Sequence, residues 1–224
     1  MRVLVLCEES QVVTKAFREK GHEAFSCDIK ECSGGHPEWH FKDDAFKIIK
    51  ANPNWDLIIC HPPCTHLANS GAKHFEKKRV DGRQREAIEF FCKCLTLKVS
   101  KLCVENPINI ISGDYVKIYY PDLCEKYGLP LKPTQIIQPY QFGNPSRKTT
   151  CLWLKGLQPL IPTNIVNPEL VTYTCKNGKK ATFSKDYVVS GDRSTKRSKT
   201  YSGIALAMAE QWSNPIKRSL LCSF

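Results

Sequence analysis

The sequence predicts an α/β protein whose core is a doubly wound, mostly parallel sheet. Short apolar runs bounded by turn residues alternate with stretches of helical period through the first half of the chain. Several of these runs end in an acidic or cysteine-containing turn, which is typical of strands that finish at the carboxyl edge of an open sheet. At 224 residues, 42% of them hydrophobic, the chain is long enough for one substantial domain.

The elements of the first half follow one another as strand and helix. The helix after the first strand places Val12, Val13, Ala16 and Phe17 on one stripe and ends at Gly21. The strands expected in this half are 3–7, 23–27, 39–41, 57–60 and 102–104. The helices expected here are 11–20, 45–51 and 85–99. Helical crossovers between parallel strands should cover both faces of the sheet.

The second half departs from this alternation. Strands are expected at 135–138 and 149–154, and a helix at 203–212, while residues 65–83 form a polar, basic loop. Residues 155–201 are polar and contain prolines, with a lysine- and arginine-rich tract at 176–199. We therefore expect a core at 1–154, a small irregular basic segment at 155–202, and a C-terminal helix and tail at 203–224 that return to the core.

The net charge of +11 favours a polyanionic partner. No basic amphipathic stretch is evident that would lie on a membrane, and no apolar stretch approaches the length that spans one. Nucleic acid is therefore the favoured partner, and we expect a monomer with no membrane association.

Twelve cysteines raise the question of disulfides and metals. The chain opens with a strand that runs into acid rather than with a leader, so we expect free thiols in a reducing cytoplasm, that of the host cell if a phage encodes the protein. No Cys-x-x-Cys pair occurs, and the prolines between Cys60, Cys64 and His66 do not suit a metal. No metal site is predicted.

The segment Cys60-His-Pro-Pro-Cys64 contains the candidate nucleophile. The apolar run before it ends at two prolines, whose restricted φ and missing N–H groups make the loop stiff. A thiol at the end of a parallel strand lies where open α/β sheets bind their ligands. Cys64 is therefore a candidate nucleophile, although isolated cysteines more often have a structural role. His61 and His66 on either side serve loop packing or proton transfer.

Acidic and polar residues follow the ends of the other predicted strands. Such groups suit a ligand rich in hydroxyl and amine groups, and an acid after the second strand commonly binds ribose hydroxyls. No Gly-x-Gly-x-x-Gly turn follows the first strand, so NAD and FAD are poor candidates, whereas two acids there suit the ammonium group of S-adenosylmethionine. The residues expected at the cofactor site are Cys7, Glu8, Glu9, Ser10, Asp28, Asp44 and Pro62. Asp44 serves equally well as a cap for the helix at 45–51.

In order and spacing, these motifs resemble those of the cytosine-C5 DNA methyltransferases, especially the compact forms of phages and prophages. Pro63-Cys64 resembles the nucleophile motif of that family, and Glu105-Asn106 resembles its Glu-Asn motif. Phe142-Gly-Asn-Pro-Ser-Arg-Lys148 is similar to its Gly-x-Pro-x-x-Arg segment, and Gly203-Ile-Ala-Leu-Ala-Met208 to its closing helix. The resemblance covers most of the chain and implies a Rossmann-like fold that uses S-adenosylmethionine.

The resemblance also implies a mechanism with three catalytic residues. Carbon 5 of cytosine becomes nucleophilic once the Cys64 thiolate adds at carbon 6, while Glu105 holds and protonates ring nitrogen 3. Arg147 would steady the carbonyl oxygen of the base and the thiolate. The target base in double-stranded DNA would be flipped out of the helix. The further residues expected to contact the base or the DNA are Pro63, Ser70, Lys73, Asn106 and Lys148.

The chain departs from the family pattern at three places. Glu8-Glu9-Ser10 replaces the usual Phe-x-Gly-x-Gly turn, Thr65 replaces the glutamine after the nucleophile, and the target-recognition region shrinks to 155–201. Two other functions stay open: an amino-methyltransferase, whose loop shares only the two prolines, and a catalytically silent nucleic-acid-binding protein. RNA or free cytidine nucleotides are alternative substrates, and Glu105 as a helix-initiating acid is the alternative role for that residue.

Overall fold

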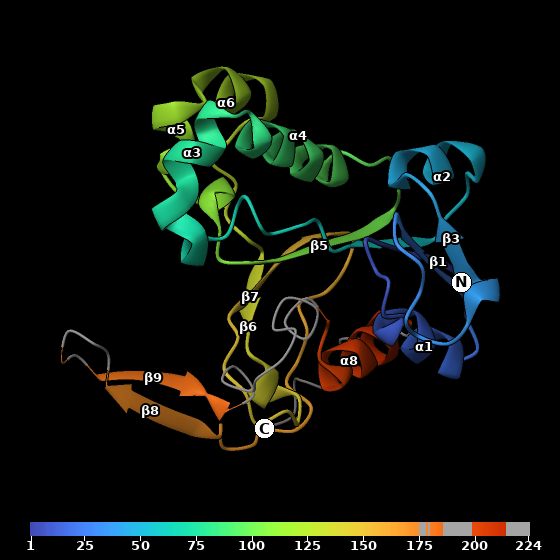
Figure 1. Cartoon of the computed structure of the whole chain (residues 1–224). Helices are drawn as coiled ribbons and strands as arrows, with labels where there is room; N and C mark the ends of the chain where they lie inside the picture. Colours follow the sequence, from blue (N-terminus) through green and yellow to red (C-terminus); the bar gives the residue numbers. More distant parts are fainter. Residues whose placement is uncertain (175–177, 179, 186–198, 214–224) are drawn as a thin grey trace, which may run out of the picture.

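A computed structural model of the chain describes residues 1–174, 178, 180–185 and 199–213. Its centre is a seven-stranded sheet in the order β3-β2-β1-β4-β5-β7-β6 (Figure 1). The strands from β3 to β5 pair in parallel, β7 runs antiparallel to β5, and β6 runs antiparallel to β7. The predicted fold class, a doubly wound and mostly parallel α/β sheet, is confirmed.

The strands lie close to their predicted positions. Their bounds are β1 Arg2–Leu6, β2 Glu23–Asp28, β3 His40–Lys42, β4 Leu57–Cys60, β5 Lys101–Pro107, β6 Gln135–Ile137 and β7 Thr150–Lys155. The chain leaves β1 to form β2 and β3 on one side and returns to form β4 on the other. The crevice where the strand order reverses therefore lies beyond the carboxyl ends of β1 and β4, which is where such sheets bind ligands.

The α-helices include three that the sequence analysis did not expect, α3, α5 and α6. Their bounds are α1 Val12–Glu19, α2 Ala45–Ala51, α3 Phe75–Val80, α4 Arg83–Leu95, α5 Tyr115–Tyr119, α6 Pro121–Tyr127 and α8 Ser202–Ser213. The prediction of a polar loop over 65–83 is wrong, because Asn69–His74 forms a 3-10 helix and α3 follows it. The reason is tertiary: Phe75 is buried, with its ring centroid 5.1 Å from that of Tyr115, so one apolar contact anchors a largely polar stretch.

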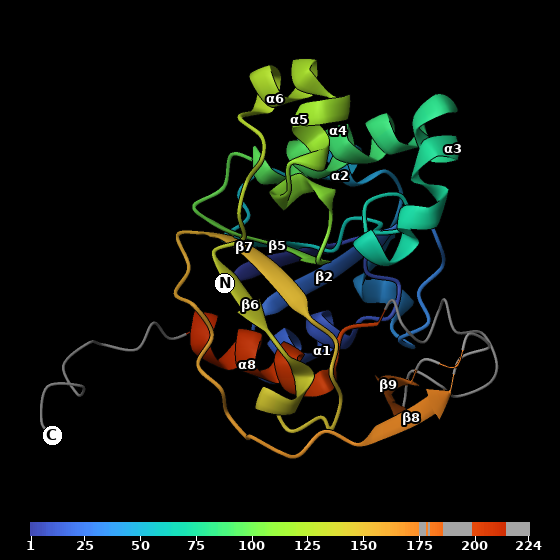
Figure 2. The same cartoon turned by 90° about the vertical axis from the view of Figure 1, so that its left-hand side faces the viewer.

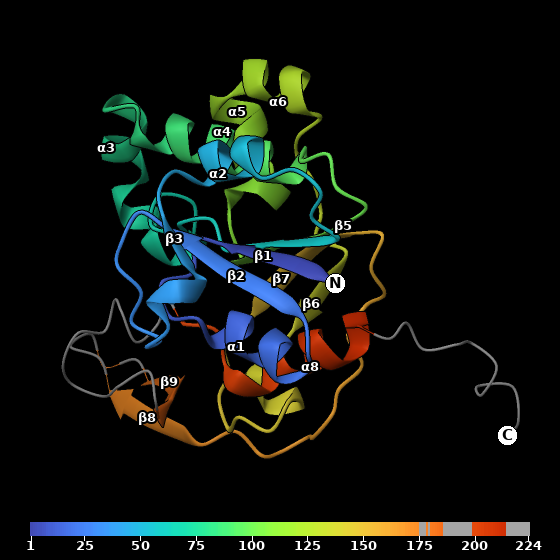
Figure 3. The ribbon, with the colours of Figure 1, turned by 90° about the vertical axis from the view of Figure 1, so that its right-hand side faces the viewer.

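Helices cover both faces of the sheet (Figures 1 and 3). Side chains alternate along β1, so that Leu4 and Leu6 pack into one layer of core while Val3 and Val5 pack into the other. The first layer contains residues from α2, α4 and α6, and the second contains residues from α1 and α8. The C-terminal helix α8 is thus part of the core next to α1.

A two-stranded hairpin extends from the body of the protein, as Figure 2 shows. It pairs β8 Leu170–Thr174 with β9 Lys180–Ser184 in an antiparallel register, so part of the segment predicted as irregular is regular. The Ser184 hydroxyl accepts a hydrogen bond from the Arg147 N–H at 2.6 Å, which fastens the base of the hairpin to the loop before β7. Most of the basic tract 176–199 lies outside the described residues.

Six of the described cysteines are buried. Cys27, Cys60, Cys92, Cys94, Cys103 and Cys151 are buried free thiols. No helix among the described residues is long and apolar enough to cross a membrane.

We expect Gly203→Ala to destabilise the fold strongly, because a Cβ at this position would lie 1.7 Å from the Phe142 carbonyl oxygen. Overpacking of this kind costs about 1–3 kcal/mol in the free energy of unfolding, measured by urea denaturation. Gly113→Ala is the control, since no atom lies within 4 Å of its Cβ position. Equal stability of the two variants would contradict the tight contact between α8 and the loop that precedes β7.

Candidate active site

Two neighbouring strands bring the main candidate residues together. β4 and β5 pair in parallel, with Cys60 opposite Val104, so the residues that follow, His61 and Glu105, come side by side at the carboxyl edge of the sheet. The His61 N–H donates to the Leu6 carbonyl at 2.9 Å and extends the alignment to β1. The predicted convergence of strand ends is therefore present in the structure.

The Pro-Pro-Cys loop is tied directly to the end of β5. The Asn106 side chain, 1% exposed, donates from Nδ2 to the Pro62 carbonyl at 2.7 Å and accepts at Oδ1 from Asn109 Nδ2 at 3.0 Å. The Cys64 carbonyl accepts from the N–H groups of Leu67 and Ala68 at 3.0 and 2.9 Å. Cys64 thus lies on a tight turn whose position relative to β5 is held by a buried amide.

Two buried polar side chains hold the segment after Cys64. Lys78 of α3, 8% exposed, donates from Nζ to the Thr65 carbonyl at 2.5 Å. Gln84 of α4, fully buried, donates from Nε2 to the His66 carbonyl at 3.1 Å. Its Oε1 accepts from the hydroxyls of Tyr115 and Tyr120, each at 3.0 Å. Successive carbonyls after Cys64 are therefore fixed by α3, which the sequence analysis took for a loop, and by the first turn of α4.

Glu105 is the best-defined ionisable group of the site. His61 Nδ1 lies 2.8 Å from Glu105 Oε2, and the two side chains are only 10% and 15% exposed. Burial favours the neutral form of Glu105, but the hydrogen bond and charge of His61 and the charge of Lys148 outweigh it and lower the pKa of the carboxyl. The Glu105 carboxyl is accordingly an anion that accepts the Nδ1–H of His61.

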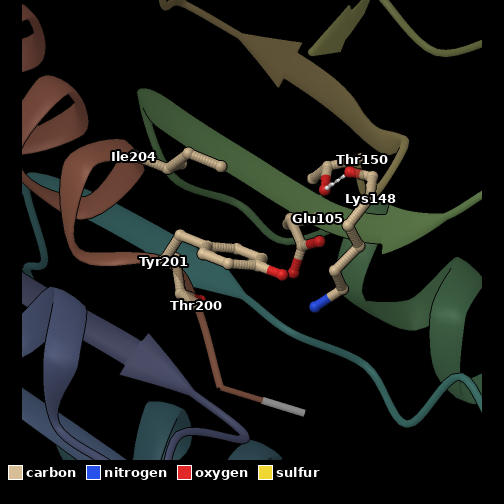
Figure 4. Close-up of a pocket in the computed structure, with 6 residues that line it drawn as sticks. All are labelled: Glu105, Lys148, Thr150, Thr200, Tyr201 and Ile204. Atoms are coloured by element: carbon tan, nitrogen blue, oxygen red, sulfur yellow. Dashed lines mark hydrogen bonds between the residues drawn. The ribbon is translucent and has the colours of Figure 1, made fainter. Parts of the chain in front are cut away.

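A small pocket opens beside Glu105, as Figure 4 shows. Its volume is about 10 Å³, enough for a single water. The residues that line it are Glu105, Lys148, Thr150, Thr200, Tyr201 and Ile204. The antiparallel register of β7, with Thr150 opposite Pro107, brings the loop before β7 to the end of β5. The Tyr201 hydroxyl lies 2.9 Å from Ser146 Oγ, which holds the phenol ring at the pocket.

The cation beside Glu105 is Lys148 rather than Arg147. Lys148 lines the pocket and lowers the pKa of Glu105, whereas Arg147 is exposed and is not among the lining residues. The backbone of Arg147 is engaged with Ser184 at the base of the hairpin. Side chains alternate in direction along extended chain, so the sequence pattern did not show which of two adjacent basic residues faces the pocket.

Glu8, the first acidic residue after β1, has a structural role inside the fold. The Glu8 carboxylate, 4% exposed, accepts from the N–H groups of Val13 and Thr14 at 2.6 and 3.2 Å and from the Thr14 hydroxyl at 2.6 Å. Burial raises the pKa of Glu8 against the lowering effects of the His61 charge and these hydrogen bonds. Glu8 therefore stabilises the start of α1, as an acid at a helix N-terminus does, and its oxygens face the helix.

The other predicted cofactor residues are spread over the same edge. Asp28 is half-buried at the end of β2 and accepts one hydrogen bond, from the Lys30 N–H at 3.0 Å. Asp44 caps α2 by accepting from the N–H groups of Phe46 and Lys47, both at 2.9 Å, as the alternative role for this residue predicted. Cys7 and Glu9 are half-buried, and Ser10 and Pro62 are buried.

The residues predicted to contact DNA fall into two groups. Pro63 is exposed directly before the nucleophile, and Ser70 and Lys73 are exposed on the 3-10 helix that follows it. Asn106 is buried, with its amide committed to Pro62 and Asn109, so it acts on the geometry of the loop. Among the described residues no group of three or more histidine, cysteine or acidic side chains is arranged to hold a metal.

Sequence reasoning overlooked Tyr201 and Gln84, took Lys78 for one of the basic residues of a loop, and left the role of His61 open. His61 stands at a strand end directly before the two prolines, which was a usable signal. Tyr201 comes from far along the chain, and the buried polar groups Lys78 and Gln84 lie in stretches of charged residues. Nothing in their local pattern distinguishes them from exposed side chains.

Comparisons with known proteins give likenesses of structure alone. No protein-family model matches the chain, and no curated protein matches it. A putative DNA modification methyltransferase encoded within a prophage of E. coli has a TM-score of 0.48 and 16% identity, covering 75% of this chain and 52% of that one. The Entamoeba histolytica methyltransferase EhMeth has a TM-score of 0.47 and 15% identity, covering 74% of this chain and 57% of that one. The S. pombe Dnmt2 methyltransferase has a TM-score of 0.40 and 14% identity, and the match covers 71% of this chain and 50% of that one.

The chain thus spans about half the length of these solved structures. The proposals below rest on the residues of the site itself.

We expect Gln84→Leu to loosen the segment after Cys64, because it leaves the His66 carbonyl and two tyrosine hydroxyls without their buried partner. The free energy of unfolding should fall by about 2 kcal/mol or more. Hydrogen exchange at the Leu67 and Ala68 amides should become faster than in the wild type.

The matched control is Glu86→Leu, an exposed position on the same helix, which should change stability by less than about 0.5 kcal/mol. If exchange at Leu67 and Ala68 is equally slow in both variants, Gln84 does not hold this segment.

Proposed function

We propose that the protein is an S-adenosylmethionine-dependent DNA methyltransferase that acts on carbon 5 of cytosine. One observation carries this proposal: the loop that bears Cys64 is tied to the strand that bears Glu105 by the 2.7 Å bond from Asn106 to the Pro62 carbonyl. A thiol and a carboxyl held on adjacent strand ends are the two groups that addition to a pyrimidine ring requires.

The addition step uses both groups at once. The Cys64 thiolate forms a bond to carbon 6, and the electron pair of the C5=C6 bond shifts toward ring nitrogen 3. Glu105 takes up a proton from water when the bound base covers it, and gives that proton to the nitrogen as the charge develops there. Carbon 5 is then part of an enamine and is nucleophilic. After methylation, the carbon-5 proton passes to water, Cys64 departs as a thiolate, and the proton on ring nitrogen 3 returns to the Glu105 carboxylate, which restores the aromatic ring.

Lys148 and Tyr201 complete the base site in this proposal. The Lys148 ammonium provides the preorganised positive charge that the sequence analysis assigned to Arg147. The pocket of about 10 Å³ is far smaller than a pyrimidine, so entry of a flipped base requires the side chain of Lys148 or Tyr201 to swing away. Lys73 and Ser70, both exposed after Cys64, are positioned to contact phosphates, in keeping with the net charge of +11.

The edge of the sheet beyond β1 and β2 suits S-adenosylmethionine, which supplies the methyl group when bound. Asp28 has an oxygen available for ribose hydroxyls, and the half-buried Glu9 suits an ammonium group. Glu8 does not suit the same role, because its carboxylate is bonded to the first turn of α1. The backbone of Cys7–Ser10, rather than the Glu8 side chain, would therefore border the cofactor.

A covalent trap tests the proposed function. We expect DNA that contains 5-fluorocytosine to form a denaturation-resistant adduct with the protein in the presence of S-adenosylmethionine, because fluorine at carbon 5 blocks release of the thiol. The adduct is measured as a band of reduced mobility under denaturing conditions. Cys64→Ala should abolish it, and Cys32→Ala, a change at a half-exposed cysteine, should not.

The outcome separates this proposal from its rivals. No adduct on any cytosine-containing duplex contradicts the proposal. Methylation that persists in Cys64→Ala favours an amino-methyltransferase, and salt-dependent DNA binding without a rise in Tm on addition of S-adenosylmethionine favours a silent binding protein.

Two adjacent basic residues allow a matched test of the pocket. We expect Lys148→Met to lower kcat for methylation about 10²-fold, since it removes the positive charge beside Glu105. Arg147→Met should leave kcat close to that of the wild type, because the Arg147 side chain is exposed outside the pocket. The reverse order of effects would restore Arg147 as the catalytic cation.

A further inference from the structure

The proposed chemistry does not yet account for His61, which makes the closest polar contact with Glu105. Nδ1 of His61 lies 2.8 Å from Glu105 Oε2, and 10% of the histidine side chain is exposed. Its other ring nitrogen, Nε2, is buried and has no hydrogen-bond partner among the described residues. This geometry fits an Nδ1–H of His61 that donates to the Glu105 carboxylate.

The charged and titratable groups around the pair come from every neighbouring element. Glu8 approaches His61 from the turn after β1, and Lys148 approaches Glu105 from the loop before β7. Cys103 of β5 and Cys151 of β7 are buried close enough to Glu105 for its charge to raise the pKa of their thiols further, after the effect of burial. Tyr201 lines the pocket at Glu105. His61 therefore interacts electrostatically with two carboxyl groups, in direct contact with that of Glu105 and through its charge with that of Glu8.

We propose that His61 is a positioning residue that holds Glu105 through Oε2 and stabilises the carboxylate left when Glu105 gives its proton to the base. This inference rests on the proposed function. With Oε2 occupied by His61 Nδ1–H, the other oxygen of Glu105 is the one available to ring nitrogen 3. Figure 4 shows the carboxylate between Tyr201 and Lys148, at the pocket that a base would enlarge.

The proton balance follows from this arrangement. Before a base binds, Glu105 is an anion; a bound base covers its remaining exposed surface, and the carboxyl takes up a proton from water at Oε1. When Cys64 adds to carbon 6, the Oε1–H bond breaks and the N3–H bond forms. The carboxylate that results is the form His61 binds best, so His61 stabilises the state with the adduct relative to the state before it.

Removal of His61 should therefore change the pKa of Glu105 in a known direction. Burial raises the pKa of Glu105, and the hydrogen bond and charge of His61 lower it. Without His61, the pKa of Glu105 should rise. The pH at which Glu105 ionises should move upward, and the carboxyl should give up its proton less readily.

Direct titration of Glu105 tests this without any need for activity. The measurement is ¹³C NMR of the protein with labelled glutamate carboxyl groups, in which Glu105→Gln assigns the signal. His61→Leu should raise the midpoint of the Glu105 titration. His61→Asn, which keeps a donor near the position of Nδ1 but carries no charge, should give a smaller rise. If His61→Leu fails to fold, His61→Asn alone still decides the sign.

Methylation kinetics and the covalent trap complete the design. We expect kcat to fall about 10²-fold in His61→Leu and less in His61→Asn. The part of the pH dependence of kcat that reports ionisation of Glu105 should move to higher pH in both variants. An unchanged Glu105 midpoint and pH profile in His61→Leu, with a normal adduct, overturns the role of His61 and leaves the proposed function intact. A wild-type protein that forms no adduct overturns the proposed function, while a raised midpoint still supports the pairing of His61 with Glu105.

Discussion

The parallel pairing of β4 with β5 is the constraint on which the candidate site depends. Because Cys60 lies opposite Val104, the turn that bears Cys64 and the strand end that bears Glu105 finish at the same edge of the sheet. Neither proline of the Pro-Pro-Cys turn donates a backbone hydrogen bond, so the turn needs an anchor from outside. Asn106 provides it at the Pro62 carbonyl, and Lys78 and Gln84 hold the two carbonyls that follow Cys64.

The pKa values of two carboxyl groups near the site, Glu8 and Glu105, shift in opposite directions. Glu8 is buried and Glu105 is half-buried; the pKa of Glu8 is raised, whereas that of Glu105 is lowered. The difference is the partner: Glu8 has helix N–H groups and a distant imidazole, whereas Glu105 has His61 in direct contact and Lys148 nearby. One carboxyl therefore supports the fold of α1, while the other is an ionised group that opens onto a pocket.

Much of the architecture was predictable because it depends on local pattern. Alternating apolar runs and helical stripes placed β1, β2, β4 and α2 within a residue or two of their observed bounds. The stretch 65–83 was predicted as a loop because its composition is polar, and it is helical because Phe75 and Lys78 are buried against other helices. The same limit applies to Arg147: two adjacent basic residues look alike in sequence, and only the antiparallel register of β7 selects Lys148 for the pocket.

By itself the sequence determined the α/β class, the positions of the strand ends and hence the candidate pair Cys64 and Glu105. These follow from short-range periodicity and from the rule that parallel strands place their carboxyl ends at one edge. Only the tertiary structure decided that His61 pairs with Glu105, that Glu8 turns inward to cap α1, and that Tyr201 closes the pocket. Each of these depends on which side chain faces which across elements far apart in the chain, and that geometry is set by packing rather than by local composition.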